Sequence, residues 1–186
     1  GFTMYSESLF IECGEGKEAG INYINGIRKK IANDQPIIGP YHVNKVGSVD
    51  MYAKGANLLS TIRSVINDDI KWRGILRGLN TDLGLKTTTT EDVINYINQK
   101  TGKDLTRIFD QYLRYTKIPT LEYKTSGKRS ISYRWQADVD GFNMPLLVKD
   151  GEKTFWINPT QAWQKIKINT TFVPDTANFY IVTKKH

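Results

Sequence analysis

The chain has 186 residues, of which 39% are hydrophobic, 24% charged and 11% aromatic, a composition typical of a globular protein. No apolar run approaches the roughly 20 residues that a membrane-spanning helix needs, so we expect no membrane span. Residues 1–118 carry 16 Lys and Arg against 13 Asp and Glu, and residues 119–186 carry 10 against 6. This dispersed net charge of +7 favours a solvated basic surface over nucleic-acid binding. The single cysteine, Cys13, excludes an internal disulfide.

Helical periodicity covers the first two thirds of the chain. Ser48 and Thr89 or Thr90 are good N-caps, Gly102 suits a helix end, and Pro119 closes the region because the residue before a proline resists helix. On the first predicted helix the apolar stripe consists of Phe2, Tyr5, Leu9 and Phe10. On the third it consists of Tyr52, Ala56, Leu59, Ile62 and Ile66. We expect six helices, over residues 2–13, 17–32, 49–67, 69–79, 90–101 and 104–117.

Two features of the helical region are unusual. The first helix has no capping residue before it, which leaves its first N–H groups unpaired, so we expect the chain to be a piece of a longer protein. Residues 33–47 contain two prolines and two glycines and follow no usable period. Long loops inside a compact domain are often functional, so this segment is a candidate rim of a binding site.

After Pro119 the apolar period changes from 3.6 to 2. Strands are expected near residues 121–123, 131–135, 146–148, 155–157, 163–168, 170–173 and 179–183, with turns at 126–128 and 150–151. Short strands at regular spacing predict a small β-sandwich. The expected fold class is therefore α+β and multidomain, with a helical domain at residues 1–118 and an immunoglobulin-like β-sandwich at 119–186. A sandwich of this size has a thin core and should lean on the helical part.

Few side chains here suit catalysis by themselves. The two histidines are His42 and His186, and the sequence lacks an H-E-x-x-H motif and a phosphate-binding glycine loop. Gly55, inside a predicted helix, costs about 1 kcal/mol relative to alanine and suggests the close approach of another backbone. Two interpretations of Tyr52 remain open. Its ring is a core residue, or its hydroxyl points into a cleft as an oxyanion donor.

Two segments resemble the zinc metallo-aminopeptidase family of aminopeptidase N and leukotriene hydrolase, the gluzincins. Residues 1–7, GFTMYSE, resemble the stretch that follows the third zinc ligand, a glutamate. Residues 51–56, MYAKGA, resemble the family's Tyr-x-Lys-Gly segment. The resemblance covers essentially the whole chain, and it implies the helical C-terminal half of a thermolysin-like catalytic domain followed by a β-sandwich.

The resemblance also implies roles for particular residues. Tyr52 matches the tyrosine that stabilises the tetrahedral oxyanion, and Glu7 matches an acid behind the zinc site that orients a ligand. Tyr41 and His42 lie in the loop that would rim the substrate cleft. The zinc ligands and the general base would all precede Gly1, so zinc is expected in the full-length parent and not in this chain. The expected partners are a peptide substrate and the missing zinc-binding part, and export of the parent would suit such an enzyme.

Two other function classes remain open. A noncatalytic relative would use its cleft or sandwich to bind a peptide or another domain, and a degraded zinc motif upstream of Gly1 would mark it. A basic nucleic-acid module would instead show salt-sensitive binding of DNA or RNA. The aminopeptidase hypothesis predicts that this chain alone has neither peptidase activity nor stoichiometric zinc.

Overall fold

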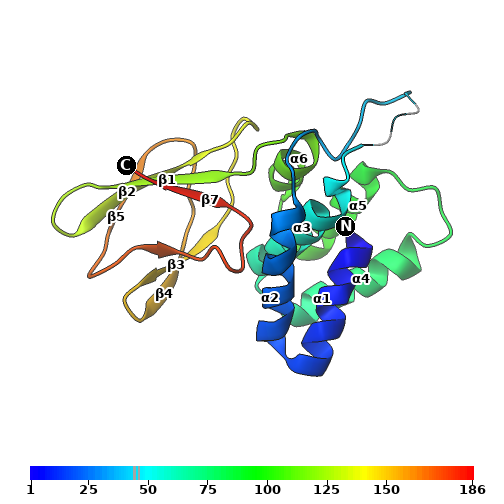
Figure 1. The fold of residues 1–186 in the computed structure, drawn as a ribbon, viewed down its shortest axis with the longest axis horizontal. Helices are drawn as coiled ribbons and strands as arrows, with labels where there is room; N and C mark the ends of the chain where they lie inside the picture. Colours follow the sequence, from blue (N-terminus) through cyan, green and yellow to red (C-terminus); the bar gives the residue numbers. More distant parts are fainter. Residues whose placement is uncertain (44, 46) are drawn as a thin grey trace.

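The computed structural model describes residues 1–43, 45 and 47–186, in a helical part and a β part that lie side by side (Figure 1). In the described residues every helix ends by Arg114 and every strand begins at or after Thr120, so the predicted α+β class is confirmed. The helices are α1 (Phe2–Glu15), α2 (Lys17–Ile27), the 3-10 turn η1 (Arg28–Lys30), α3 (Asp50–Ile66), α4 (Asp69–Asp82), α5 (Thr90–Thr101) and α6 (Thr106–Arg114). The strands are β1 (Thr120–Thr125), β2 (Ser130–Gln136), β3 (Leu146–Asp150), β4 (Lys153–Ile157), β5 (Gln164–Lys167), β6 (Val173–Pro174) and β7 (Val182–Lys185).

Capping residues define the start of α4 and both ends of α5. Thr89 and Asp92 form a reciprocal capping box at the start of α5, and Gly102 ends that helix with a φ of 69°. Asp68 caps α4 by accepting a hydrogen bond from the Lys71 amide. These local signals act within one turn of the chain, and of the two cap residues predicted for α5 the structure has Thr89. In the described residues no helix is both long and apolar enough to cross a membrane.

The second helix ends earlier than predicted, because tertiary contacts override its periodicity. It was expected to reach residue 32, but α2 ends at Ile27 and tightens into η1. The Arg28 guanidinium leaves the helix surface to bind the Asn57 side chain and the carbonyl of Thr176. Beyond it, the carboxylate of Asp50 accepts the amide hydrogens of Ala32 and of the next residue, which turns the chain away from the helix axis.

Helix α3 forms the centre of the helical part and is buried over most of its length. A Cβ atom added to Gly55 would lie 2.9 Å from the Cα of Gly1, so the expected close approach of another backbone is confirmed. At the far ends of the same two helices, the Arg63 guanidinium binds both carboxylate oxygens of Glu12 at 2.5 and 2.8 Å. Helices α1 and α3 therefore run parallel, and the start of α1 lies level with Gly55.

The apolar stripes of α1 and α3 differ from the predicted ones. On α1, Tyr5 is buried and receives a hydrogen bond from the Trp72 indole at 2.9 Å, but Phe10 is 81% exposed and Phe2 is 44% exposed. On α3, Tyr52 is 54% exposed, so placing it on the buried stripe was wrong. Periodicity marks a preferred face, whereas neighbouring elements decide how much of that face is covered. Here α1 is covered by α2 and α3, and Phe10 extends past them.

The β part consists of two small sheets with orders β5-β2-β1-β7 and β4-β3-β6. Strands β1 and β2 pair antiparallel, as do β3 and β4 across the predicted turn at Asp150, while β1 and β7 pair parallel. Inward residues of both sheets share one core that includes Leu121, Trp135, Leu146 and Val148. The Asp150 carboxylate accepts amide hydrogens from residues 169–171, which lowers the pKa of Asp150 to about 2 and fixes the following loop.

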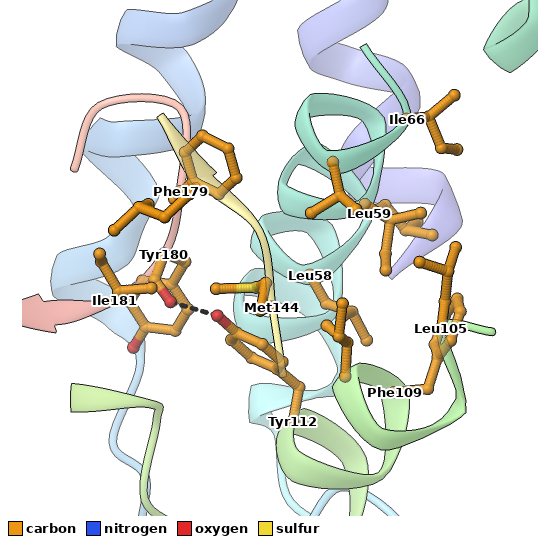
Figure 2. Packing of buried hydrophobic residues seen from close by; sticks show 14 of the residues in the cluster. Leu58, Leu59, Ile66, Leu105, Phe109, Tyr112, Met144, Phe179, Tyr180 and Ile181 are labelled. Atoms are coloured by element: carbon orange, nitrogen blue, oxygen red, sulfur yellow. Dashed lines mark hydrogen bonds between the residues drawn. The ribbon is translucent and has the colours of Figure 1, made fainter. Parts of the chain in front are cut away.

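Residues 179–181 join the β part to the helices instead of forming the predicted start of the last strand (Figure 2). Phe179, Tyr180 and Ile181 are all buried in the common core. The hydroxyl of Tyr112, on α6, donates a hydrogen bond to the Tyr180 carbonyl, and the Tyr180 amide donates to Thr61 on α3. The β part therefore packs on the helices as expected, although the domain limits of 1–118 and 119–186 remain a prediction.

The Gly55 contact leads to a stability prediction. We expect Gly55→Ala to lower the free energy of unfolding by about 1 kcal/mol, because the new methyl group collides with the Gly1 backbone and outweighs the better helix propensity of alanine. A Cβ on Gly74, in α4, would meet nothing within 4 Å, so Gly74→Ala should instead stabilise the chain by up to about 1 kcal/mol. Urea unfolding of both variants measures the difference, and equal effects would contradict the contact.

Candidate active site

The first turn of α3 presents Tyr52 to solvent at one end of the helical part. From Ala53 to Asn57 every residue of α3 is buried, whereas Tyr52 is more than half exposed. Its phenol is therefore not a core residue, and its hydroxyl is accessible to a bound molecule. Of the two interpretations left open by the sequence, the core one is wrong. The catalytic role itself remains a prediction.

The loop that precedes α3 rises from the same end of the helices (Figure 1). The Ser48 amide donates to the Pro36 carbonyl at 3.3 Å, which closes the base of the loop. The Ile38 amide donates to the Leu113 carbonyl at 3.0 Å, which ties one arm of the loop to α6. Tyr41 is exposed near the tip, where the neighbouring His42 has a φ of 61°. Two residues of the predicted rim, 44 and 46, lie outside the described residues.

An ion-pair cluster lies beside this loop. Arg114, the last residue of α6, binds Asp110 at 2.9 Å and Glu91 at 2.8 Å. The hydrogen bond from Arg114 to Asp110 raises the pKa of Arg114 above its ordinary value. Tyr41 itself is exposed on the loop.

An apolar cavity of about 260 Å³ opens beside the Tyr52 turn. Met51 and Gly55 from α3 line it, together with Phe109 and Leu113 from α6 and Ile38 from the loop. Gly1, at the point where α1 meets α3, also lines this space. The arrangement places an exposed phenol, an apolar hollow and a loop at one end of the helices, which is a plausible geometry for holding a short peptide.

Glu7 lies away from Tyr52. Its carboxylate accepts a hydrogen bond from the Tyr23 hydroxyl of α2, and this bond raises the pKa of Tyr23. Tyr52 precedes Gly55 by three residues, and Glu7 follows Gly1 by six. Since Gly1 lies level with Gly55 and each helical residue rises 1.5 Å, Tyr52 and Glu7 are separated by about 14 Å along the parallel axes. The structure therefore brings Tyr52 and the loop to one end of the helices, and does not bring Glu7 to them.

Asp50 and Lys54 are the residues that sequence reasoning missed. Both are almost completely buried, although charged side chains usually remain exposed. The signal that was available is their spacing of four, which puts two opposite charges on one face of a predicted helix. Their partners are main-chain groups far along the chain, so no local pattern identifies them.

The donor set for zinc does not fit this chain alone. Outside residues 44 and 46, the structure holds no group of three His, Cys, Asp or Glu side chains placed to bind a metal ion. A tetrahedral zinc site in a peptidase needs three such protein ligands and one open position. Any metal site that Tyr52 faces would therefore need ligands from other residues.

Comparison with known proteins shows the fold alone. No protein-family model and no curated protein sequence matches the chain. Among solved structures, it is similar to Legionella pneumophila aminopeptidase A in complex with aspartic acid, with a TM-score of 0.70 and 16% identity. The match covers 100% of this chain but only 23% of that chain, so the present chain spans about a quarter of the length of its structural neighbour. The chain thus has the fold of one portion of an aminopeptidase.

Proposed function

We propose that this chain is a portion of a zinc-dependent aminopeptidase, in which Tyr52 stabilises the oxyanion formed when the first peptide bond is attacked. The observation that carries the proposal is the exposure of Tyr52 on the first turn of a buried helix. The whole of this chain matches the fold of one part of an aminopeptidase. An exposed phenol at the start of a helix is a hydrogen-bond donor that a bound molecule can reach. Such donors act where negative charge develops in the transition state.

The proposal gives a role to several of this chain's own residues. The Tyr52 hydroxyl donates to the substrate carbonyl oxygen as that oxygen gains charge, and the apolar hollow beside Met51 receives an apolar part of the peptide. Tyr41 and His42 line the rim of the loop. Glu7 is too far from Tyr52 to share the same reacting atoms, and its proposed role is to orient a metal ligand from behind the zinc site.

The test is a comparison between this chain and the longer protein proposed to contain it. The longer protein should release amino acids from aminoacyl p-nitroanilides, lose this activity with a chelator and regain it with zinc. The 186-residue chain should show neither activity nor tightly held zinc. One zinc bound per 186-residue chain would contradict the proposal. A longer protein without activity and without an H-E-x-x-H motif would favour the noncatalytic peptide-binding relative.

A further inference from the structure

Two buried charges flank Tyr52 on α3. Asp50 is 1% exposed and Lys54 is fully buried, and they lie one turn apart on the same face of the helix. Each residue advances an α-helix by about 100°, so Tyr52, midway between them, points to the opposite side. The buried face of α3, opposite the exposed Tyr52 ring, therefore carries two charged groups.

Lys54 binds the segment that leads into the β part. Its ammonium group donates to the carbonyl oxygens of Tyr115 at 2.9 Å and Thr116 at 3.0 Å. These residues follow the end of α6 and precede β1. Burial lowers the pKa of Lys54, whereas the nearby negative charge of Asp50 acts in the opposite direction. Burying a cation costs free energy unless the cation is hydrogen-bonded, so the two carbonyl oxygens are needed to keep Lys54 in this position.

Asp50 reaches the β part by a second route. Its carboxylate accepts the amide hydrogens of Ala32 at 2.9 Å and Asn33 at 2.7 Å. The Asn33 side-chain amide then donates to the Tyr180 hydroxyl at 3.2 Å. Tyr180 precedes β7, and its ring lies beneath the guanidinium of Arg28. Two separate hydrogen-bonded routes therefore run from the first turn of α3 to the β part.

The packing on this side of the junction is open. A cavity of about 560 Å³ lies between the first sheet and the segments that join it to the helices, lined by Asn33, Thr116, Ile118, Gln136 and Asp138. On this side, the β part is therefore joined to α3 by the hydrogen bonds of Lys54 and Asp50, without continuous apolar packing. A change in the position of the β part would reach the first turn of α3 through Lys54 and Asp50.

We propose that the β part positions the Tyr52 hydroxyl, with Lys54 and Asp50 as positioning residues that connect the two. The catalytic consequence rests on the proposed function, whereas the mechanical coupling does not. A displacement of about 1 Å at a reacting group costs on the order of 100-fold in rate. The β part would thus act on the active site without touching the substrate.

The coupling is tested in the 186-residue chain by 19F NMR with 3-fluorotyrosine, the Tyr52 signal being assigned by its loss in Tyr52→Phe. We expect Lys54→Met to shift this signal and to speed amide exchange in the first turn of α3 by on the order of tenfold. Tyr180→Phe, which removes only the hydroxyl on the second route, should move the signal in a smaller step. Lys71→Met, a change to an exposed lysine on α4, is the control and should leave it in place.

An unchanged Tyr52 signal and unchanged exchange in folded Lys54→Met and Tyr180→Phe would overturn the coupling. Tyr180→Phe decides the matter if Lys54→Met does not fold, because it keeps the buried ring. In the longer protein, Lys54→Met should lower kcat by about 10- to 100-fold with little change in KM. A shifted signal in a longer protein without peptidase activity would leave the coupling intact and reject the proposed function instead.

Discussion

Tyr52→Phe is expected to lower the kcat of the proposed aminopeptidase by about 100-fold and to change KM by less than about threefold. The substitution removes one hydroxyl that is needed when the substrate carbonyl becomes an oxyanion, and it retains the aromatic ring. Because Tyr52 is more than half exposed, the free energy of unfolding should change by less than about 0.5 kcal/mol. Steady-state kinetics on an aminoacyl p-nitroanilide, with a thermal melt of the same sample, measures both quantities.

The control for this experiment is Tyr96→Phe. The Tyr96 hydroxyl binds Asp82 at 2.8 Å on the α4–α5 side of the helices, away from the Tyr52 turn. This variant should keep its kcat within about twofold of the wild type. Full activity in Tyr52→Phe would show that the exposed phenol has another purpose, and the oxyanion role would have to be withdrawn.

Arg63→Met is expected to lower the free energy of unfolding by about 3 kcal/mol, because it leaves charged groups without their partner. The Arg63 side chain and the Glu12 side chain are each only 12% exposed, and the same guanidinium binds Asp69 at 2.7 Å. These contacts join α1, α3 and α4 at the end of the helices opposite to Tyr52. Urea unfolding measures the loss.

Arg73→Met is the matched control for Arg63→Met. Arg73 lies 3.6 Å from Glu12 but its side chain is 62% exposed, so solvent screens the pair. Its removal should cost less than about 0.5 kcal/mol. A cost for Arg63→Met as small as that of the control would contradict the cluster.

The same cluster sets an acid dependence. Hydrogen bonds from Arg63 lower the pKa of both Glu12 and Asp69 below their ordinary values. The unfolded chain then binds more protons than the folded chain once the pH falls through ordinary carboxyl pKa values near about 4. The stabilisation is complete above that range and is lost as the pH falls further. In the Arg63→Met variant the free energy of unfolding should fall less steeply between about pH 5 and 2. Asp69 is more exposed than Glu12, so it should contribute less to this difference.

Elements governed by neighbours in the chain were predicted closely. The Thr89 cap and Gly102 define α5, and the turn at Asp150 defines the hairpin of β3 and β4. Their hydrogen bonds form within a few residues, so the relevant information is local. The glycine at position 55 also signalled a close backbone contact correctly, whereas Gly74, inside α4, has no such contact.

Features that depend on distant residues were missed or misplaced. Helix α2 stops early because Arg28 reaches Asn57 and Thr176, and residues 179–181 leave the strand pattern because they pack on α3 and α6. Tyr52 was assigned to a buried stripe since its spacing fits one. The periodicity of a helix cannot tell whether another element covers its first turn.

The candidate site divides in the same way. The resemblance of residues 1–7 and 51–56 to the gluzincins was enough to suggest an aminopeptidase and to name Tyr52 as an oxyanion donor. The parallel packing of α1 and α3 then set Glu7 about 14 Å along from Tyr52, and folding brought Lys54 to the carbonyls of Tyr115 and Thr116. Short-range hydrogen bonding is encoded in neighbouring residues, so it can be inferred from the sequence. The distance between a phenol and a carboxylate on two helices depends on how those helices pack, and that arises only when the whole chain has folded.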